Sequence, residues 1–458
     1  MIDKLVSRGI SRVRALVGRG ERPRRLVDKD LPALRQQLQE CAAGIGGEVS
    51  ARQRAVRLAH TYLGLDQGGR RTMLGLIASD FGPDPAEVAA AHAAWQAAVG
   101  TPGQWQAEAA LRTALRSRRT RILTQFNAMP QGVKFLVDLR AELIGFAKDD
   151  PALGALDREL ETRLAAWFDV GFLELQRITW QSPASLLEKL IQYEAVHAIR
   201  SWSDLKNRLD SDRRCYAFFH PRMPLEPLIF VEVALVDGLA EGVQPLLDEA
   251  APVLDPERAN TAIFYSINNT QDGLRGVSFG NFLLKRVVDD LQRDFPRLAT
   301  FATLSPIPGL VGWARRNPAE MAACFSDGDW KRLRAQGVEG PDAPLFADLL
   351  AGRGDWSAQP ALARALKDPL QRVAARYLLE ARREGKPADP VARFHLGNGA
   401  RVERLNWLGD TSDKGLAQSW GMMVNYLYDP ARIEDNVESF MAGGKLDTSA
   451  SLRRLAKA

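Results

Sequence analysis

The chain is poor in the residues that hold metals and form disulfides. Its 458 residues include only three cysteines and five histidines, and both kinds are scattered along the sequence. The cysteines form no CxxC pair and imply no disulfide framework, so a reducing compartment is the default. The histidines form no HxxxH or His–Cys cluster, which argues against a protein-bound zinc ion. The composition therefore predicts a protein without a metal site.

Long apolar runs are also absent. No stretch reaches the length that a membrane-spanning helix requires, and no hydrophobic signal-peptide core follows the N-terminal charges. The first thirty residues are rich in arginine, but they also hold Asp3, Glu21, Asp28 and Asp30. These acids are too many for a good organelle-targeting peptide. We therefore expect an exposed basic arm on a cytoplasmic protein that does not bind a membrane.

Charge of one sign is not concentrated enough to indicate a nucleic-acid partner. The formal net charge is +5, and charged residues make up 26% of the chain, which is ordinary for a globular protein. Such a mild positive excess suits an anionic ligand. With 46% hydrophobic residues, the chain is long enough to form two or three domains with their own cores.

The two parts of the chain differ in character. From about Leu31 to Phe168, good helix formers dominate and apolar residues recur at three- and four-residue spacing. Later runs such as RCYAFFH and LEPLIFVEVALVD are rich in aromatic and β-branched residues and predict strands. The sequence therefore predicts an all-α helical bundle over residues 1–168 and a domain with a mixed sheet over residues 169–458.

The segment from Thr261 to Ser305 has the order strand, glycine-rich loop, helix, strand. Such a unit makes a right-handed crossover between parallel strands, and ligands bind these sheets at the carboxyl ends of the strands. The loop NNTQDGLRGVSFGN offers bare backbone at a helix N-terminus, where unpaired amides attract anions. It lacks the lysine of a P-loop and the GxGxxG spacing of a dinucleotide fold, so neither ATP nor a nicotinamide cofactor is indicated.

One short string within this loop points to a different ligand. RGVSFG, from Arg275 to Gly280, resembles the pyrophosphate-binding loop of the GNAT acetyltransferase superfamily, with Ser278 where a central glycine is expected. By itself this pattern leaves two interpretations open. One is a grip on the pyrophosphate of coenzyme A, and the other is a glycine-rich turn that binds nothing.

Longer strings resemble the malonyl-CoA decarboxylase family. In chain order they include RITWQSPASLLEKL, YEAVHAI, RRCYAFFHPRMPLEPL, IFYSINNTQDGLRGV, LSPIPGL and HLGNGARVERLNWLGDTSDKGLAQSWGMMVNYLY. The resemblance covers Phe168 to about Tyr428, whereas the helical part is similar only in outline. It implies a lyase that converts malonyl-CoA to acetyl-CoA and carbon dioxide. It also implies a GNAT-like catalytic domain over residues 169–458 and a homotetramer assembled through the helical domain.

The resemblance further implies the site residues. The catalytic serine and histidine of the family fall on Ser305 and His395, and a second serine discussed for its active site falls on Ser266. Ser305 is also expected to contact the substrate. The loop that holds coenzyme A falls on Arg275, Gly276, Val277, Ser278, Phe279, Gly280 and Asn281. Ser278 stands where the family often has a glutamate.

Other matching residues are expected to support the site without reacting. Asn406, Asp410 and Asn425 are assigned to the layer behind the catalytic residues, with Asp410 as the best carboxylate for orienting a histidine. His197, at a helix end, and His220, before a turn, are expected to be structural, because a buried or surface histidine is far commoner than a catalytic one.

The implied chemistry needs no cofactor. When malonyl-CoA loses carbon dioxide, the thioester carbonyl accepts the electrons, so no metal, pyridoxal phosphate or thiamine is required. The enolate oxygen needs fixed donors, and the carbon needs a proton, which a histidine titrating near neutral pH supplies. We therefore expect His395 to protonate C2, and Ser305 to orient the carboxylate or hydrogen-bond the histidine. No GxSxG elbow surrounds Ser305, which argues against an acyl-enzyme.

Two other functions are compatible with the same cleft, a CoA-dependent acyltransferase and a non-catalytic acyl-CoA-binding module. The chain ends in LAKA and so carries no peroxisomal Ser-Lys-Leu signal. With no clear transit peptide either, we expect a cytoplasmic, bacterial enzyme of malonate or fatty-acid metabolism.

Overall fold

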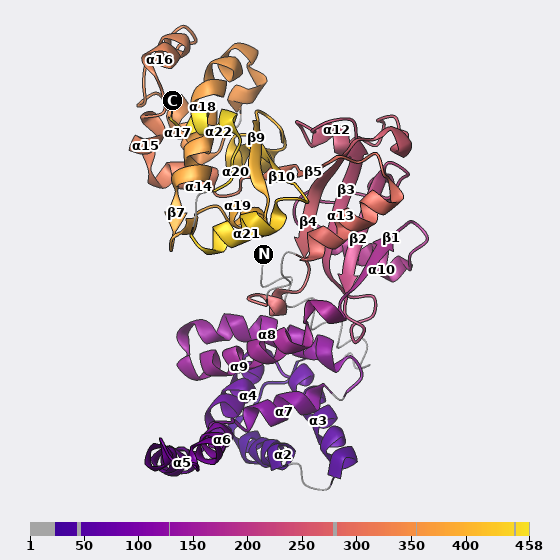
Figure 1. The fold of residues 1–458 in the computed structure, drawn as a ribbon, viewed down its shortest axis with the longest axis vertical. Coiled ribbons are helices and arrows are strands. Elements are labelled where there is room, and N and C mark those ends of the chain that lie inside the picture. Colours follow the sequence, from indigo (N-terminus) through magenta and orange to yellow (C-terminus); the bar gives the residue numbers. More distant parts are fainter. Residues whose placement is uncertain are drawn as a thin grey trace. The chain divides into compact units, whose positions relative to one another are not determined.

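The structure, a computed structural model, describes residues 23–43, 47–127, 129–277, 282–353, 355–443 and 446–457. The chain divides into two compact units (Figure 1). Unit 1 comprises Met1–Glu174, Phe219–Leu228 and Thr270–Ser278, and unit 2 comprises Leu175–Phe218, Ile229–Asn269 and Phe279–Ala458. The domain boundary expected at residue 168 lies near the end of the first of these segments, but unit 1 also takes in two short segments from later in the chain.

Unit 1 is a helical bundle. In the described residues its α-helices are α2 (Leu31–Ala43), α3 (Gly47–Gly64), α4 (Gln67–Asp80), α5 (Pro85–Ala98), α6 (Gln104–Ala114), α7 (Arg119–Phe126), α8 (Gly132–Phe146) and α9 (Pro151–Trp167). Asp84 and Asp150 cap α5 and α9 by accepting hydrogen bonds from first-turn amides. A proline follows each cap at the first helical position, where no backbone donor is needed. Local sequence therefore sets where these helices begin.

Unit 2 is built on a mixed sheet. Its strands lie in the order β1-β2-β3-β4-β5-β10-β6, with β9 beside β10. The strands are β1 (Glu174–Ile178), β2 (Arg213–Phe219), β3 (Pro227–Val236), β4 (Thr261–Asn269), β5 (Thr300–Thr303), β6 (Ser305–Pro306), β9 (Arg401–Asn406) and β10 (Met423–Tyr428). β4 pairs with β5 in parallel, whereas β4 pairs antiparallel with β3, and β10 antiparallel with β5, β6 and β9. A helical bundle followed by a mixed-sheet domain confirms the predicted fold class.

Helices surround this sheet and also form the C-terminal part of unit 2. They are α10 (Ala184–Tyr193), α11 (Trp202–Asn207), α12 (Gln244–Leu247), α13 (Phe282–Asp294), α14 (Leu310–Arg316), α15 (Pro318–Ala322), α16 (Asp327–Arg334), α17 (Pro344–Ala351), α18 (Pro360–Glu380), α19 (Pro390–Gly397), α20 (Asp413–Ser419), α21 (Ile433–Met441) and α22 (Ala450–Lys457). The short strands β7 (Arg382–Arg383) and β8 (Lys386–Pro387) form a separate antiparallel pair. Searching the described helices for one both long and apolar enough to cross a membrane finds none.

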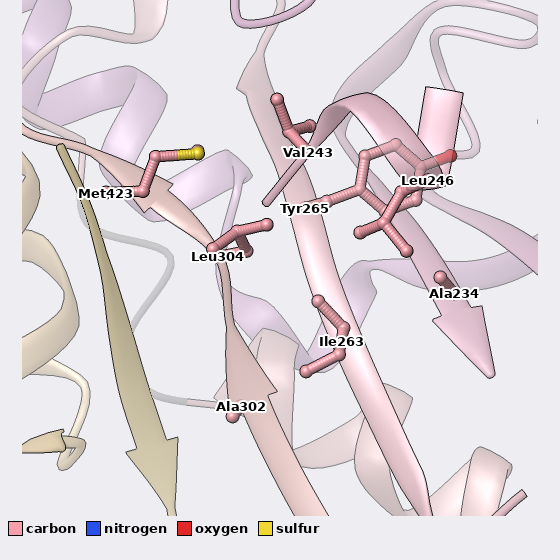
Figure 2. Close-up of a cluster of buried hydrophobic side chains, with 8 residues drawn as sticks. All are labelled: Ala234, Val243, Leu246, Ile263, Tyr265, Ala302, Leu304 and Met423. Carbon is pink, nitrogen blue, oxygen red and sulfur yellow. The ribbon is translucent and has the colours of Figure 1, made fainter. Parts of the chain in front are cut away.

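A buried apolar cluster holds together the strands around the parallel pair (Figure 2). It comprises Ala234, Val243, Leu246, Ile263, Tyr265, Ala302, Leu304 and Met423. Tyr265 of β4 points into this cluster, and side chains alternate between the two faces of a strand. The pairing of β4 with β3 shifts register between Phe264 and Ser266, so this alternation is interrupted at Tyr265, and Ser266 pairs with Glu232.

β4 and β5 separate before β4 ends. Phe264 and Thr303 form the last parallel pair, and one further bond joins the Leu304 amide to the Phe264 carbonyl at 3.0 Å. Ser305 then pairs with Val424 of β10, while β4 continues alongside β3. The parallel pairing that the sequence predicts for this unit is confirmed, and the two strands diverge at their carboxyl ends.

Candidate active site

Ser305 and His395 lie in hydrogen-bond contact. Ser305 begins β6, directly after the parallel pair, and His395 lies in the last turn of α19. Asp389 caps α19 by accepting from the amides of Val391 and Ala392 at 2.9 and 3.0 Å. The Ser305 Oγ and His395 Nε2 atoms are 3.0 Å apart, although the residues are 90 positions apart in the sequence. The fold thus brings together the serine and the histidine that the resemblance singled out.

Tyr428 and Thr303 extend this pair into a chain of hydrogen bonds. The His395 Nδ1 atom is 2.8 Å from the Tyr428 hydroxyl, and Ser305 Oγ donates to Thr303 Oγ1 at 2.8 Å. The ring of Tyr426 stacks on the imidazole, with 4.6 Å between the centroids. A tyrosine hydroxyl that donates to Nδ1 selects the neutral imidazole tautomer whose proton is on Nε2, which faces Ser305.

The sequence reasoning missed Tyr428 and Thr303. Tyr428 ends the string MVNYLY, and its backbone pairs with Phe301 of β5 in the antiparallel register that aligns β10 with the site. Tyr426 and Tyr428 are two positions apart on one strand, so their side chains share a face. This spacing was the one available signal, and it became informative only once the register of β10 was known.

Burial keeps His395 neutral in the free protein. Its residue is 3% exposed, and burial lowers the pKa of the imidazole from the ordinary 6.5 to about 3. Burial also raises the pKa of the Tyr428 hydroxyl well above 10, so that this group stays protonated. The expected titration of His395 near neutral pH therefore does not hold for the unliganded site. An acid role requires that bound substrate raises this pKa.

Ser305, His395 and Ser266 line one cavity. It has a volume of about 360 Å³, and its walls come from β4, β6, α19 and Val196. It lies where β4 and β5 diverge, so the strand separation creates the space. Among the described residues, no group of three or more His, Cys, Asp or Glu side chains, in this cavity or elsewhere, could hold a metal ion.

Ser266 is held by a buried carboxylate. Its Oγ atom lies 3.0 and 2.8 Å from the two carboxylate oxygens of Glu194. The Asn268 side chain donates to Ser266 Oγ at 2.8 Å and to Glu194 at 2.7 Å. Because a carboxylate only accepts, the Ser266 hydrogen points at Glu194 and the oxygen remains an acceptor. Sequence reasoning matched Glu194 within YEAVHAI but gave it no role.

Asn406 and Asn425 support the serine end of the site. The Asn406 side chain donates to Asn425 Oδ1 at 2.9 Å, and Asn425 donates to the Thr303 carbonyl at 2.8 Å. Thr303 in turn accepts from Ser305. The two asparagines are therefore placed to fix the backbone next to Ser305.

Asp410 lies in a different environment from the one expected for it. Its carboxylate accepts from Gln244 at 2.9 Å, and its charge acts on His197. The two ring nitrogens of His395 contact Ser305 and Tyr428 instead. The residue that orients His395 is therefore a tyrosine hydroxyl, and Asp410 adjoins a second histidine.

The loop expected to hold coenzyme A is only partly described. Ser278, Phe279, Gly280 and Asn281 lie outside the described residues. The Arg275 side chain is 57% exposed and pairs with Asp272 at 3.1 Å. The amides of Leu274, Arg275 and Val277 donate to carbonyls within the loop. These three amides are therefore already used and are not free to bind an anion.

Two glycines of this loop are needed for packing and backbone conformation within unit 1. A Cβ atom on Gly273 would lie 1.8 Å from the backbone oxygen of Val137 in α8, and Gly276 has a φ of +88°. Arg140 of α8 donates to the carbonyls of Gly273 and Arg275 at 2.8 and 2.7 Å. Close packing on α8 and a left-handed turn thus explain two glycines that the sequence analysis related to phosphate binding.

The fold and the site define a two-domain α+β enzyme with a buried serine–histidine pair placed for acid–base chemistry in a cavity. Family comparison identifies which enzyme family this is. The description "Malonyl-CoA decarboxylase C-terminal domain" matches residues 171–458, and "Malonyl-CoA decarboxylase N-terminal domain" matches residues 81–168. The chain belongs to the malonyl-CoA decarboxylase family.

Solved structures of this family resemble the chain over nearly its whole length. The malonyl-CoA decarboxylase of Rhodopseudomonas palustris is 39% identical with a TM-score of 0.81, covering 94% of this chain and 100% of that one. The malonyl-CoA decarboxylase of Cupriavidus metallidurans is 44% identical with a TM-score of 0.71, covering 93% and 100%.

Curated relatives correct the expected localisation. The enzyme of Anser anser anser is 40% identical over 395 residues, which is 82% of this chain and 78% of that protein. The enzyme of Rattus norvegicus is 37% identical over 417 residues, or 86% and 83%. Both, and a relative from Mus musculus, are named mitochondrial. These mitochondrial relatives contradict the cytoplasmic localisation that was predicted from the weak N-terminal targeting signals, whereas the solved structures named above come from bacteria.

Proposed function

We propose that the chain decarboxylates malonyl-CoA through a thioester enolate that His395 protonates at C2. Family membership establishes the overall reaction, from malonyl-CoA to acetyl-CoA and carbon dioxide. The observation that supports the role of His395 is its 3.0 Å contact with Ser305 in the wall of the cavity where β4 and β5 diverge. The acyl group therefore binds in this cavity, next to Nε2.

The proton balance decides the state in which His395 acts. The bond between C2 and the carboxylate carbon breaks, its electrons enter the thioester carbonyl, and the enolate then takes one proton at C2. The reaction thus consumes one proton, which a neutral imidazole does not supply without becoming an anion. The malonyl carboxylate, bound within a few ångströms, favours the charged imidazolium and raises the pKa of His395. Bound substrate therefore brings His395 into the charged imidazolium form that can donate the proton.

Ser305 acts as the bridge between the imidazole and the substrate. Its oxygen contacts Nε2, and its hydrogen is directed toward Thr303. It thereby accepts the Nε2 proton in a hydrogen bond and holds the ring beside the place of C2. The diverging edge of β4 beyond Phe264 has no partner strand in β5. We assign its backbone groups, apart from the Tyr265 carbonyl that His197 binds, to the thioester and to the amides of the pantetheine arm.

Residues Arg275 to Asn281 are assigned to the pyrophosphate of coenzyme A. The exposed guanidinium of Arg275 supplies the formal charge, and Arg140 fixes the loop by binding its carbonyls. We also assign assembly of the enzyme into a homo-oligomer to the helical unit. Helices α5 and α6 are described in full and contain no buried residue, so both offer their faces to a second copy.

The deciding experiment separates binding from proton transfer. Purified wild-type protein with malonyl-CoA and no acceptor should form acetyl-CoA and carbon dioxide, and His395→Ala should lower kcat by about 10² to 10⁴ while still binding acetyl-CoA. In D₂O, the wild type should also exchange the C2 hydrogens of acetyl-CoA, and His395→Ala should not. Exchange that survives in His395→Ala would assign the proton to another group.

A further inference from the structure

The loop after α10 forms a second wall of the substrate cavity. It carries the string YEAVHAI, residues 193–199, of which Glu194 and Val196 have a part in the site described above. Next to the cavity of Ser305 and His395 lies another of about 260 Å³, lined in part by His197 and Asn268. The two cavities share the lining residues Val196, Ile267, Asn269 and Pro306. They are therefore adjoining parts of one hollow.

His197 lines this hollow, and its ring carries a buried acceptor. The residue is 8% exposed, and among the residues that the structure describes, its Nε2 atom has no hydrogen-bond partner. The ring bonds to the backbone carbonyl of Tyr265, and a carbonyl only accepts, so Nδ1 carries the proton. Burial lowers the pKa of His197 to about 4, which keeps the ring neutral. The Nε2 lone pair can therefore accept a hydrogen bond from a ligand.

The position of His197 is fixed by its own loop. Glu194 accepts from the backbone amides of Val196 and His197 at 2.7 and 2.8 Å. Lys414 donates to the carbonyls of Ala195 and Val196 at 2.6 and 2.9 Å. A carboxylate and an ammonium group thus hold the loop through its amides and its carbonyls. The acceptor is part of a built site, as a binding residue must be.

We infer that His197 is a substrate-binding residue whose Nε2 accepts a hydrogen bond from an amide N–H of the pantetheine arm. The malonyl group and the thioester carry acceptors only, so the acyl end of the substrate has no donor to offer. The first donor along a CoA thioester is the amide N–H two carbons beyond the sulfur. With the acyl group beside His395, the adjoining hollow takes the start of this arm. His197 thus recognises the carrier of the acyl group.

Three malonyl thioesters test the role of His197. Malonyl-CoA and malonyl-N-acetylcysteamine carry the amide N–H, whereas malonyl S-propyl thioester does not. His197→Phe should raise KM about tenfold for the first two, the effect of one lost hydrogen bond to a buried acceptor, with kcat within about threefold. His197→Gln should restore most of the affinity, because its side-chain oxygen reaches the place of Nε2. Neither change should affect the S-propyl thioester.

Two results would overturn the inference. An unchanged KM for malonyl-CoA in His197→Phe would mean that Nε2 binds only a water molecule. An equal loss on the S-propyl thioester would mean a structural role. The matched control is His220→Gln, since the His220 ring is fully used by the Trp167 carbonyl and the Arg222 amide, each at 3.1 Å. It should leave every KM unchanged.

The inference rests on decarboxylation of a CoA thioester and not on which group protonates C2. Binding of acetyl-CoA should therefore be compared in His395→Ala and in His197→Phe/His395→Ala by calorimetry. The double variant should bind about tenfold more weakly. Equal affinities would contradict the role of His197 whatever the outcome for His395.

Discussion

At the scale of single residues, two buried histidines are assigned to adjoining parts of the substrate, the acyl group and the start of the pantetheine arm. In His395, the Tyr428 hydroxyl on Nδ1 turns the Nε2 proton toward Ser305. In His197, a carbonyl on the ring places the proton on the other nitrogen and leaves Nε2 as an acceptor. The neighbours of each ring thus select its tautomer, and the tautomer decides whether the ring donates or accepts.

The first residue-scale prediction concerns stability against pH. Burial lowers the pKa of His395 to about 3 and that of His197 to about 4, whereas both lie near 6.5 in the unfolded chain. Below pH 6.5 the unfolded chain binds protons that the folded chain excludes, so the free energy of unfolding falls as the pH falls. Urea unfolding between pH 7 and 4.5 should show a shallower decline in His395→Gln. Identical slopes in the wild type and in His395→Gln would contradict this prediction.

The second prediction concerns proton uptake with substrate. An unreactive analogue with a sulfonate in place of the malonyl carboxylate should raise the pKa of His395 and bind together with up to one proton near pH 7. Calorimetry in buffers of different ionisation enthalpy measures this uptake. Acetyl-CoA, which lacks the anionic group, is the control and should take up none. Uptake that persists in His395→Gln would place the proton elsewhere.

At the scale of elements, the diverging strands β4 and β5 create the site. Their parallel pairing ends at Phe264 and Thr303, and β10 then binds Ser305. Residues 270–277 of the loop between β4 and α13 belong instead to unit 1, where Gly273 packs on α8. Both strands of the crossover and its helix therefore belong to unit 2, whereas part of its loop belongs to unit 1.

A glycine substitution tests this packing. Gly273→Ala would place a methyl group against the Val137 carbonyl and should destabilise the protein by about 1–3 kcal/mol, because a backbone atom cannot move aside like a side chain. Its KM for malonyl-CoA should rise as the loop is displaced. Gly75→Ala in α4, where an added Cβ meets nothing within 4 Å, is the matched control and should be neutral or slightly stabilising. Denaturant unfolding distinguishes the two, and equal stability would contradict the packing argument.

At the scale of the whole molecule, the helical unit offers a surface for assembly. Trp105, in α6, is 74% exposed, and Val99 beside α5 is 53% exposed. Large apolar side chains grouped on one exposed helical hairpin are typical of a protein interface. We therefore propose that the predicted homo-oligomer forms through this hairpin.

Light scattering after size-exclusion chromatography tests the assembly. Trp105→Glu should shift the protein to a smaller species, because a buried charge at an interface is costly. Trp180→Glu replaces another exposed tryptophan, 42% exposed and in unit 2, and should leave the mass unchanged. A mass that is the same in wild type and Trp105→Glu would remove the hairpin from the interface.

The sequence predicted more of the fold than of the site. The helical bundle, the strand runs and the crossover were predictable, because periodicity, caps and turns are local properties. The pairing of β10 with β5 and β6 was not, although it places Tyr428 beside His395. Asp410 was expected to orient a histidine. Its carboxylate instead accepts a hydrogen bond from Gln244, and its charge acts on His197.

The sequence by itself determined the order of elements, the family and the residues Ser305, His395 and Ser266, because these are properties of strings along the chain. Only the tertiary structure decided how those residues act. It made His395 neutral by burying it and turned the Ser266 hydroxyl toward Glu194. It also left the Nε2 atom of His197 without a partner among the described residues. Proton positions depend on burial and on neighbours that are distant in sequence, and these exist only in the folded chain.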